Sequence, residues 1–101
     1  MNPIRSLMHD QLDSLYRVAK SGGMYPEDFR RIEQSLCAVK GVAVYGKPIL
    51  QSALNKALAE IDDFEPRMAG FCQRVPRRTK AEIARIRRVL AGLQHAAGTR
   101  H

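Results

Sequence analysis

The sequence predicts an all-α protein, a compact bundle of four main helices plus one short helix. Apolar residues recur three and four positions apart over most of the 101 residues, which is the period of an amphipathic helix. Proline and glycine fall between these periodic segments, where helices begin and end. The content of 45% hydrophobic and 27% charged residues is that of a globular domain. We expect one domain over residues 1–94 and a frayed tail at 95–101, with main helices at about 3–20, 26–45, 48–63 and 79–94 and a short helix at about 64–75.

The first expected helix, at 3–20, has a regular apolar stripe and a clear end. Its stripe follows 4-4-3-4 spacing and consists of Ile4, Met8, Leu12, Leu15 and Ala19. Asp13 and Arg17, four residues apart, form a pair on the opposite face. The glycine pair at 22–23 ends the helix because glycine readily adopts the left-handed conformation found at helix termini.

The second expected helix begins at Pro26, with Glu27 and Asp28 near the positive end of its dipole. Gly41 and the β-favouring residues after it also allow a break or a short strand at 41–45. A lone strand would have no partner, however, and one apolar seam continues to residue 43. The sequence therefore favours a helix that continues to Tyr45.

The third helix is expected from Pro48, and Pro66 is expected to interrupt it, because proline lacks an N–H and clashes with the preceding turn. Asp62 or Asp63 would then cap a short helix that ends before Pro76. The last helix carries the pattern Thr-x-x-Glu, in which the threonine at position 79 and the glutamate at 82 would each satisfy a backbone N–H of the other.

Charge is distributed unevenly along the chain, whose formal net charge is +7. Residues 1–66 carry eight Lys or Arg and nine Asp or Glu, whereas residues 67–101 carry nine Lys or Arg and only Glu82 as an acidic residue. Such asymmetry is typical of a surface for nucleic acid or for an acidic partner. The candidate contact residues are Arg74, Arg77, Arg78, Lys80, Arg85, Arg87 and Arg88.

On the last expected helix, Arg88 lies opposite the apolar stripe, with Arg85 and Arg87 on its flanks. Small residues lie between them on the outer face, where a partner approaches the backbone closely, while guanidinium groups reach phosphate or carboxylate. A solvated face that only keeps the protein in solution is the competing interpretation. The choice of arginine over lysine favours binding.

No pattern indicates an enzyme, a cofactor, a small-molecule substrate or a metal site. His9, His95 and His101 lack the spaced partners of a zinc site, and Cys37 and Cys72 form neither a metal motif nor a disulfide framework. Free thiols fit a reducing compartment, and no apolar run is long enough to cross a bilayer, so we expect a cytoplasmic protein without a membrane partner.

The expected function is that of a non-enzymatic accessory or regulatory protein that contacts nucleic acid, or a nucleic-acid-bound complex, through its arginine-rich C-terminal third. The second hypothesis is a protein–protein adaptor, chaperone or inhibitor that acts through apolar helix faces. It rests on the wide apolar arc of residues 3–20, where Leu7, Tyr16 and Val18 extend the stripe and predict a partner face or a homodimer interface.

Overall fold

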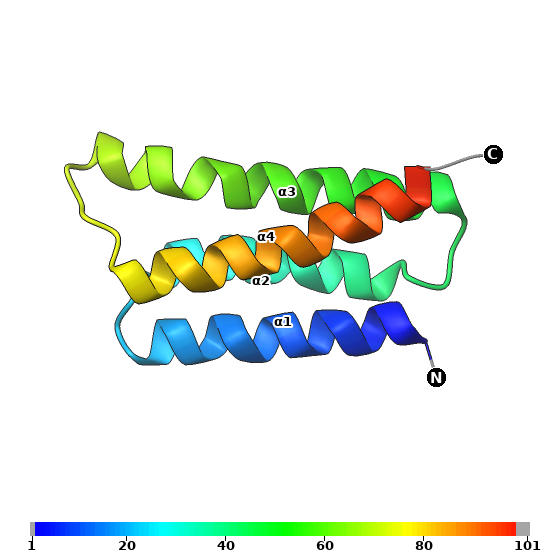
Figure 1. The fold of residues 1–101 in the computed structure, drawn as a ribbon, viewed down its shortest axis with the longest axis horizontal. Coiled ribbons are helices and arrows are strands. Elements are labelled where there is room, and N and C mark those ends of the chain that lie inside the picture. Colours follow the sequence, from blue (N-terminus) through cyan, green and yellow to red (C-terminus); the bar gives the residue numbers. More distant parts are fainter. Residues whose placement is uncertain (1, 99–101) are drawn as a thin grey trace.

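The computed structural model describes residues 2–98, and of residues 97 and 98 the backbone only. This part of the chain folds into four helices, α1 (Pro3–Lys20), α2 (Pro26–Gly41), α3 (Lys47–Gly70) and α4 (Arg77–Gly98). Successive helices run antiparallel, and α4 returns to lie beside α1 (Figure 1). Each helix packs against two neighbours, and the diagonal pairs α1–α3 and α2–α4 are farther apart, so the predicted all-α bundle is confirmed.

The expected first helix is confirmed at both ends. The Asn2 side chain caps its start by accepting hydrogen bonds from the backbone N–H groups of Ile4, at 2.9 Å, and Arg5, at 3.3 Å. At the other end Gly22 adopts a φ of +82°, and the Gly23 N–H donates to the Val18 carbonyl at 3.0 Å. These are the features of a helix end closed by a left-handed residue.

The core is built from aliphatic side chains of all four helices around Phe64. Leu15, Ile32, Leu54 and Ile86 are among the fully buried residues, one from each helix. The side of the core between α1 and α4 differs, because Gln11, Ser14 and Thr79 are buried there among the apolar groups. No helix among the described residues is both long and apolar enough to cross a bilayer.

The expected continuation of α2 to Tyr45 is wrong, because α2 ends at Gly41 and residues 42–44 form a turn. The Tyr45 N–H donates to the Val42 carbonyl at 3.0 Å within this turn. Glycine and β-branched residues are poor helix formers, so the last turn of the expected helix is weak. Ala43 is still buried, and its carbonyl accepts a 3.5 Å hydrogen bond from the Asn2 side chain.

The separate short helix expected at 64–75 does not exist, because α3 continues through Pro66 to Gly70. Phe64 and Met68, on either side of the proline, are both buried on the stripe that α3 turns toward the core. Their packing stabilises the helical path against the local cost of proline, since tertiary burial overrides intrinsic propensity. Asp62 and Asp63 therefore lie inside α3 and do not cap a new helix.

The end of α3 lies in the region where the sequence predicted more helix. Cys72 adopts a φ of +56°, and the N–H of Gln73 donates to the Met68 carbonyl at 2.9 Å. This closes α3 in the same way that Gly22 closes α1. Residues 73–76 then connect to α4 without regular structure.

The expected capping box at Thr79 is also wrong. α4 begins two residues earlier, at Arg77, and the Pro76 carbonyl accepts the Lys80 N–H at 3.0 Å. Thr79 is 2% exposed, and its hydroxyl donates a 3.0 Å hydrogen bond to the carbonyl of Gly23, so it joins α4 to the α1–α2 connection. Of the tail expected at 95–101, residues 95–98 belong to α4, and residues 99–101 lie outside the described residues.

Candidate nucleic-acid interface

The outer face of α4 is a ridge of arginine and small residues. Arg77, Ala81, Ala84, Arg88 and Gly92 follow one another at three- or four-residue spacing, and all of them are exposed. The buried residues of α4, such as Ile83, Ile86 and Leu90, lie on the opposite side. The helical period therefore places this row of residues in solvent, as the sequence pattern predicted.

Three of the seven predicted basic residues are held by carboxylates within the molecule. Arg87 binds Asp62 of α3 through both carboxylate oxygens, with Nε–Oδ1 at 2.6 Å and Nη2–Oδ2 at 3.2 Å. The hydrogen bond from Arg87 lowers the pKa of the Asp62 carboxyl. Lys80 lies 3.5 Å from a carboxylate oxygen of Glu65, also on α3. The third of these residues, Arg85, lies on the other side of α4.

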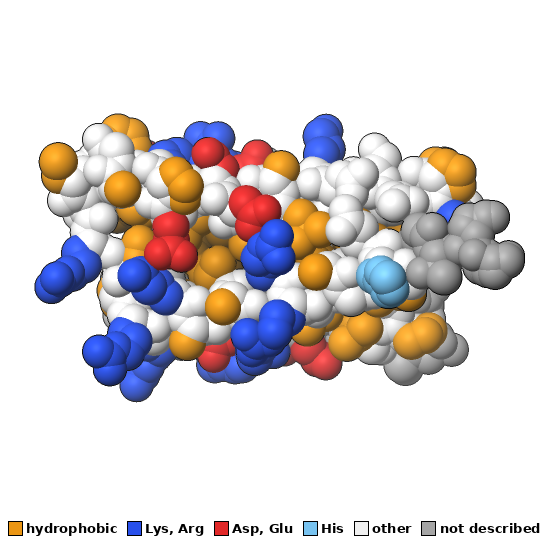
Figure 2. All heavy atoms as spheres, turned by 45° about the horizontal axis from the view of Figure 1, so that its top comes forward, with side chains coloured by type: hydrophobic (Ala, Val, Ile, Leu, Met, Phe, Trp, Pro, Cys, Tyr) orange, Lys and Arg blue, Asp and Glu red, His pale blue; other side chains and the backbone are white. Residues whose placement is uncertain are grey.

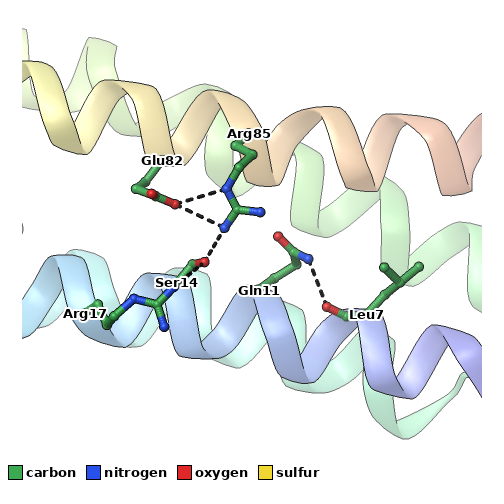
Figure 3. A network of polar contacts seen from close by, with 6 residues as sticks. All are labelled: Leu7, Gln11, Ser14, Arg17, Glu82 and Arg85. Carbon is green, nitrogen blue, oxygen red and sulfur yellow. Dashed lines mark hydrogen bonds and ion pairs between the residues drawn. The ribbon is translucent and has the colours of Figure 1, made fainter.

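Arg85 belongs to a polar network between α4 and α1 (Figure 3). Its Nε and Nη2 donate to the same oxygen of Glu82, at 3.2 and 3.1 Å, and Nη2 also donates to the hydroxyl of Ser14. Ser14 is buried and receives a second hydrogen bond from Arg17, at 3.3 Å. The guanidinium of Arg85 therefore joins two helices, and it is less available to a partner than the sequence suggested.

Gln11 lies beside this network and is 2% exposed. Its side-chain nitrogen donates to the Leu7 carbonyl at 3.0 Å, while its oxygen Oε1 has no hydrogen-bond partner among the described residues (Figure 3). An unpaired buried polar atom costs free energy. The contact between α1 and α4 therefore includes buried polar groups, one of which lacks a hydrogen-bond partner among the described residues.

The remaining four predicted residues have no hydrogen bond or ion pair among the described residues. We name this set the basic patch; it consists of Arg74, Arg77, Arg78 and Arg88. Figure 2 shows Lys and Arg side chains gathered at the end of the bundle where α4 begins. The first turn of α4 has no acidic residue, although acidic residues stabilise that end of a helix and basic ones oppose it. Positive charge is thus concentrated at the start of α4, where it does not stabilise the helix.

The three residues predicted to form a partner face on α1 do not share one exposed surface. Val18 is buried and Leu7 is half-buried, because α1 packs against α2 on one side and α4 on the other. Only Tyr16 is exposed, and its ring lies 6.4 Å from that of Phe29 in an edge-to-face arrangement. The wide apolar arc of α1 is thus used within the bundle.

The other exposed large apolar side chains lie near the two ends of the bundle. Val44, Tyr45 and Ile49 lie in and just after the α2–α3 connection. Tyr25 precedes α2 and Phe71 follows α3, at the end where the basic patch begins. Phe71 falls within the short helix expected at about 64–75, which does not exist, and the sequence pattern did not indicate that its side chain is exposed.

No group of three or more His, Cys, Asp or Glu side chains in the described part of the chain could hold a metal ion. Cys37 and Cys72 are both free and exposed. Comparison of the chain with protein-family models, with curated proteins and with solved structures found no match.

Proposed function

We propose that this protein is a non-enzymatic accessory or regulatory protein that binds nucleic acid, or a nucleic-acid-bound complex, through the basic patch. The observation that carries the proposal is the division of the seven predicted basic residues. Lys80, Arg85 and Arg87 have carboxylate partners, whereas the four residues of the basic patch have none among the described residues. Repulsion within such a patch is relieved when phosphates approach it.

The proposal gives a quantitative expectation for salt. A protein that neutralises four phosphates of a duplex releases their counterions, so the logarithm of its affinity falls with the logarithm of salt with a slope of about −3.6. Between about 50 and 200 mM salt this amounts to roughly a hundredfold loss of affinity. Contacts of this kind are independent of base sequence.

The small residues of the α4 ridge support close approach by a partner. A Cβ atom added at Gly92 would meet nothing within 4 Å, so no packing contact inside the protein requires glycine there. Glycine in a helix interior lowers stability by about 1 kcal/mol relative to alanine. A partner backbone that approached α4 beside Arg88 would explain the glycine at position 92, which packing within the protein does not require.

The test compares two variants that each lose two positive charges. Arg77→Gln/Arg88→Gln removes half of the basic patch, and Arg5→Gln/Arg30→Gln removes exposed arginines of α1 and α2. Binding to a mixed-sequence DNA and RNA pool is measured by anisotropy at several salt concentrations. We expect the first variant to lose affinity and to reduce the salt slope by about 2, and the control to retain both.

Equal losses in the two variants would show a nonspecific effect of net charge, and salt-independent or absent binding would refute the proposal. An acidic polypeptide that binds where nucleic acid does not would assign the basic patch to an acidic protein partner instead.

A protein–protein adaptor, chaperone or inhibitor is the second candidate. The apolar surface that supports it lies at the α2–α3 connection and not on α1. Val44, Tyr45 and Ile49 are each at least half exposed, and large apolar groups gathered at a surface are typical of a protein interface. A homodimer would use the same surface. Measuring the mass of the protein and of Tyr45→Ala/Ile49→Ser by light scattering tests for this homodimer. The expected compartment for either function is the cytoplasm.

A further inference from the structure

Two exposed aromatic side chains share a hollow at the end of the bundle that carries the α1–α2 and α3–α4 connections. Tyr25 and Phe71 are 48% and 65% exposed, and both line a hollow of about 480 Å³ together with Met68 and Arg31. Tyr25 also lines a second hollow of about 140 Å³, whose wall includes Arg74. The Tyr25 ring therefore lies between two adjoining depressions.

Neither aromatic side chain is accounted for by the helix end beside which it lies. Tyr25 occupies the position before the first turn of α2, where Ser, Thr, Asp or Asn would cap the helix, and its side chain makes no capping hydrogen bond. Phe71 follows the last residue of α3 and forgoes the burial that an aromatic ring favours. Figure 2 shows hydrophobic side chains at this end of the molecule, near the gathered Lys and Arg.

The orientation of Tyr25 is held by a contact across the hollows. Its hydroxyl donates a 2.8 Å hydrogen bond to the side-chain oxygen of Gln73. The backbone of Gln73 is held at the end of α3, because its N–H donates to the Met68 carbonyl. The Tyr25 ring is thus exposed to solvent while its hydroxyl is hydrogen-bonded to the α3–α4 connection.

Unpaired arginines lie on both hollows. Asp28, which lines the larger hollow, accepts hydrogen bonds of 3.0 and 2.8 Å from Arg67, and Arg67 is shared with Asp63, four residues before it in α3. Glu27 is the other acidic side chain there, against the unpaired Arg31 of the same hollow and Arg74 of its neighbour. Arg77 and Arg78 follow Arg74 in the chain after Val75 and Pro76. Exposed aromatic rings beside unpaired arginines form the pattern of a base-stacking site with phosphate contacts.

We propose that this end of the bundle binds single-stranded nucleic acid, with bases stacked on Tyr25 and Phe71 and the adjoining phosphates on Arg31 and Arg74. The proposal rests on the proposed function and specifies its substrate, since only unpaired bases offer their faces to an aromatic side chain. A duplex would still contact the arginines through its backbone, with no gain from the rings.

The first experiment separates bases from phosphates. Anisotropy compares a labelled oligothymidylate, an abasic oligomer of equal length and charge, and a duplex, at one moderate salt concentration. We expect the oligothymidylate to bind about tenfold more tightly than the abasic oligomer. Phe71→Ala should remove most of this difference and leave binding of the abasic oligomer unchanged. Tyr45→Ala, which removes an equally exposed ring at the opposite end, should change neither.

The second experiment reports on Tyr25 directly. The chain contains three tyrosines and no tryptophan, so its intrinsic fluorescence comes from Tyr16, Tyr25 and Tyr45. Stacking of a base on Tyr25 should quench part of this signal. The quenching should persist in Tyr45→Phe and disappear in Tyr25→Phe, which keeps a ring at that position and preserves the packing.

The outcomes distinguish this inference from the function on which it rests. Equal affinity for the oligothymidylate and the abasic oligomer, or unchanged quenching in Tyr25→Phe, would overturn base stacking, while a loss of binding in Arg77→Gln/Arg88→Gln would still support the basic patch. Failure to bind any of the three nucleic acids would overturn both.

Discussion

The contact between Gly23 and Thr79 joins the α1–α2 connection to the first turn of α4, and it admits no side chain at position 23. A Cβ atom built on Gly23 would lie within 3.0 Å of the Thr79 hydroxyl oxygen, closer than Cβ atoms approach other atoms, and 3.2 Å from Val18. Thr79 is β-branched and buried, so its hydroxyl cannot move aside without losing its hydrogen bond to the Gly23 carbonyl. Gly23→Ala should therefore destabilise the fold.

The magnitude follows from two contributions. Overpacking by one methyl group costs about 1–3 kcal/mol, and the displaced hydroxyl loses a hydrogen bond worth about 1 kcal/mol. Thr79→Ala removes that hydrogen bond together with the buried γ-methyl group and should cost about 1–3 kcal/mol. In Gly23→Ala/Thr79→Ala the new methyl group occupies the space of the lost hydroxyl. We expect the double variant to be more stable than the sum of the single changes by about 1–2 kcal/mol. The contact with Val18 remains, so the rescue is incomplete.

Urea denaturation followed by far-UV circular dichroism measures these free energies, with unchanged m-values as the condition for comparing them. Gly92→Ala is the matched control, since a Cβ atom there meets nothing within 4 Å and alanine is the better helix former. This control should be about as stable as the parent protein or more stable. Additive effects of the changes at positions 23 and 79 would refute the proposed contact.

Two further predictions concern the polar groups of the bundle. Gln11→Met removes the unpaired buried Oε1 at similar volume, together with the hydrogen bond from Nε2 to the Leu7 carbonyl. Because an unpaired buried oxygen costs more than one ordinary hydrogen bond contributes, the free energy of unfolding should rise by about 1 kcal/mol, or roughly 4–8 °C in Tm by calorimetry; a lower Tm would contradict this balance. The pKa of the Asp62 carboxyl is lowered by Arg87, so this pair stabilises the fold above about pH 4 and the contribution is lost as the pH falls through the lowered pKa. Asp62→Asn should therefore be less stable than the parent protein at neutral pH, and denaturation in acid should show the difference vanish; a difference that persists at low pH would contradict the assignment.

Helix boundaries were predictable where one local signal decides them. The predicted bounds of α1 are correct at both ends, because Pro3 and the glycine pair at 22–23 begin and end a helix through local backbone conformation alone. Pro66 and Thr79 gave wrong expectations for a common reason. The local signal at each position was correctly read, but distant residues decide the outcome, namely the burial of Phe64 and Met68 for the proline and the carbonyl of Gly23 for the threonine.

The candidate site shows the same limit. The excess of positive charge in the last third of the chain is visible in the sequence, but its division into paired and unpaired residues is not. Arg87 meets Asp62 from 25 positions away, and Arg85 meets Ser14 from 71 positions away. These pairings depend on which helices become neighbours in the bundle. The basic patch consists of the predicted basic residues that remain without such a partner among the described residues.

Because the four helices alternate in direction, α1 begins and α4 ends at the same end of the bundle, and the α1–α2 and α3–α4 connections lie together at the other (Figure 1). A label, a surface linkage or a fused domain attached near Asn2 or beyond α4 is thereby held away from Tyr25, Phe71 and the start of α4. The protein can be immobilised through either end in a binding assay without covering the surface under study. A short linker that joins the two ends, with a new opening in the α2–α3 connection, would give a circularly permuted chain that presents the same two connections, since such rearrangements are tolerated at exposed sites.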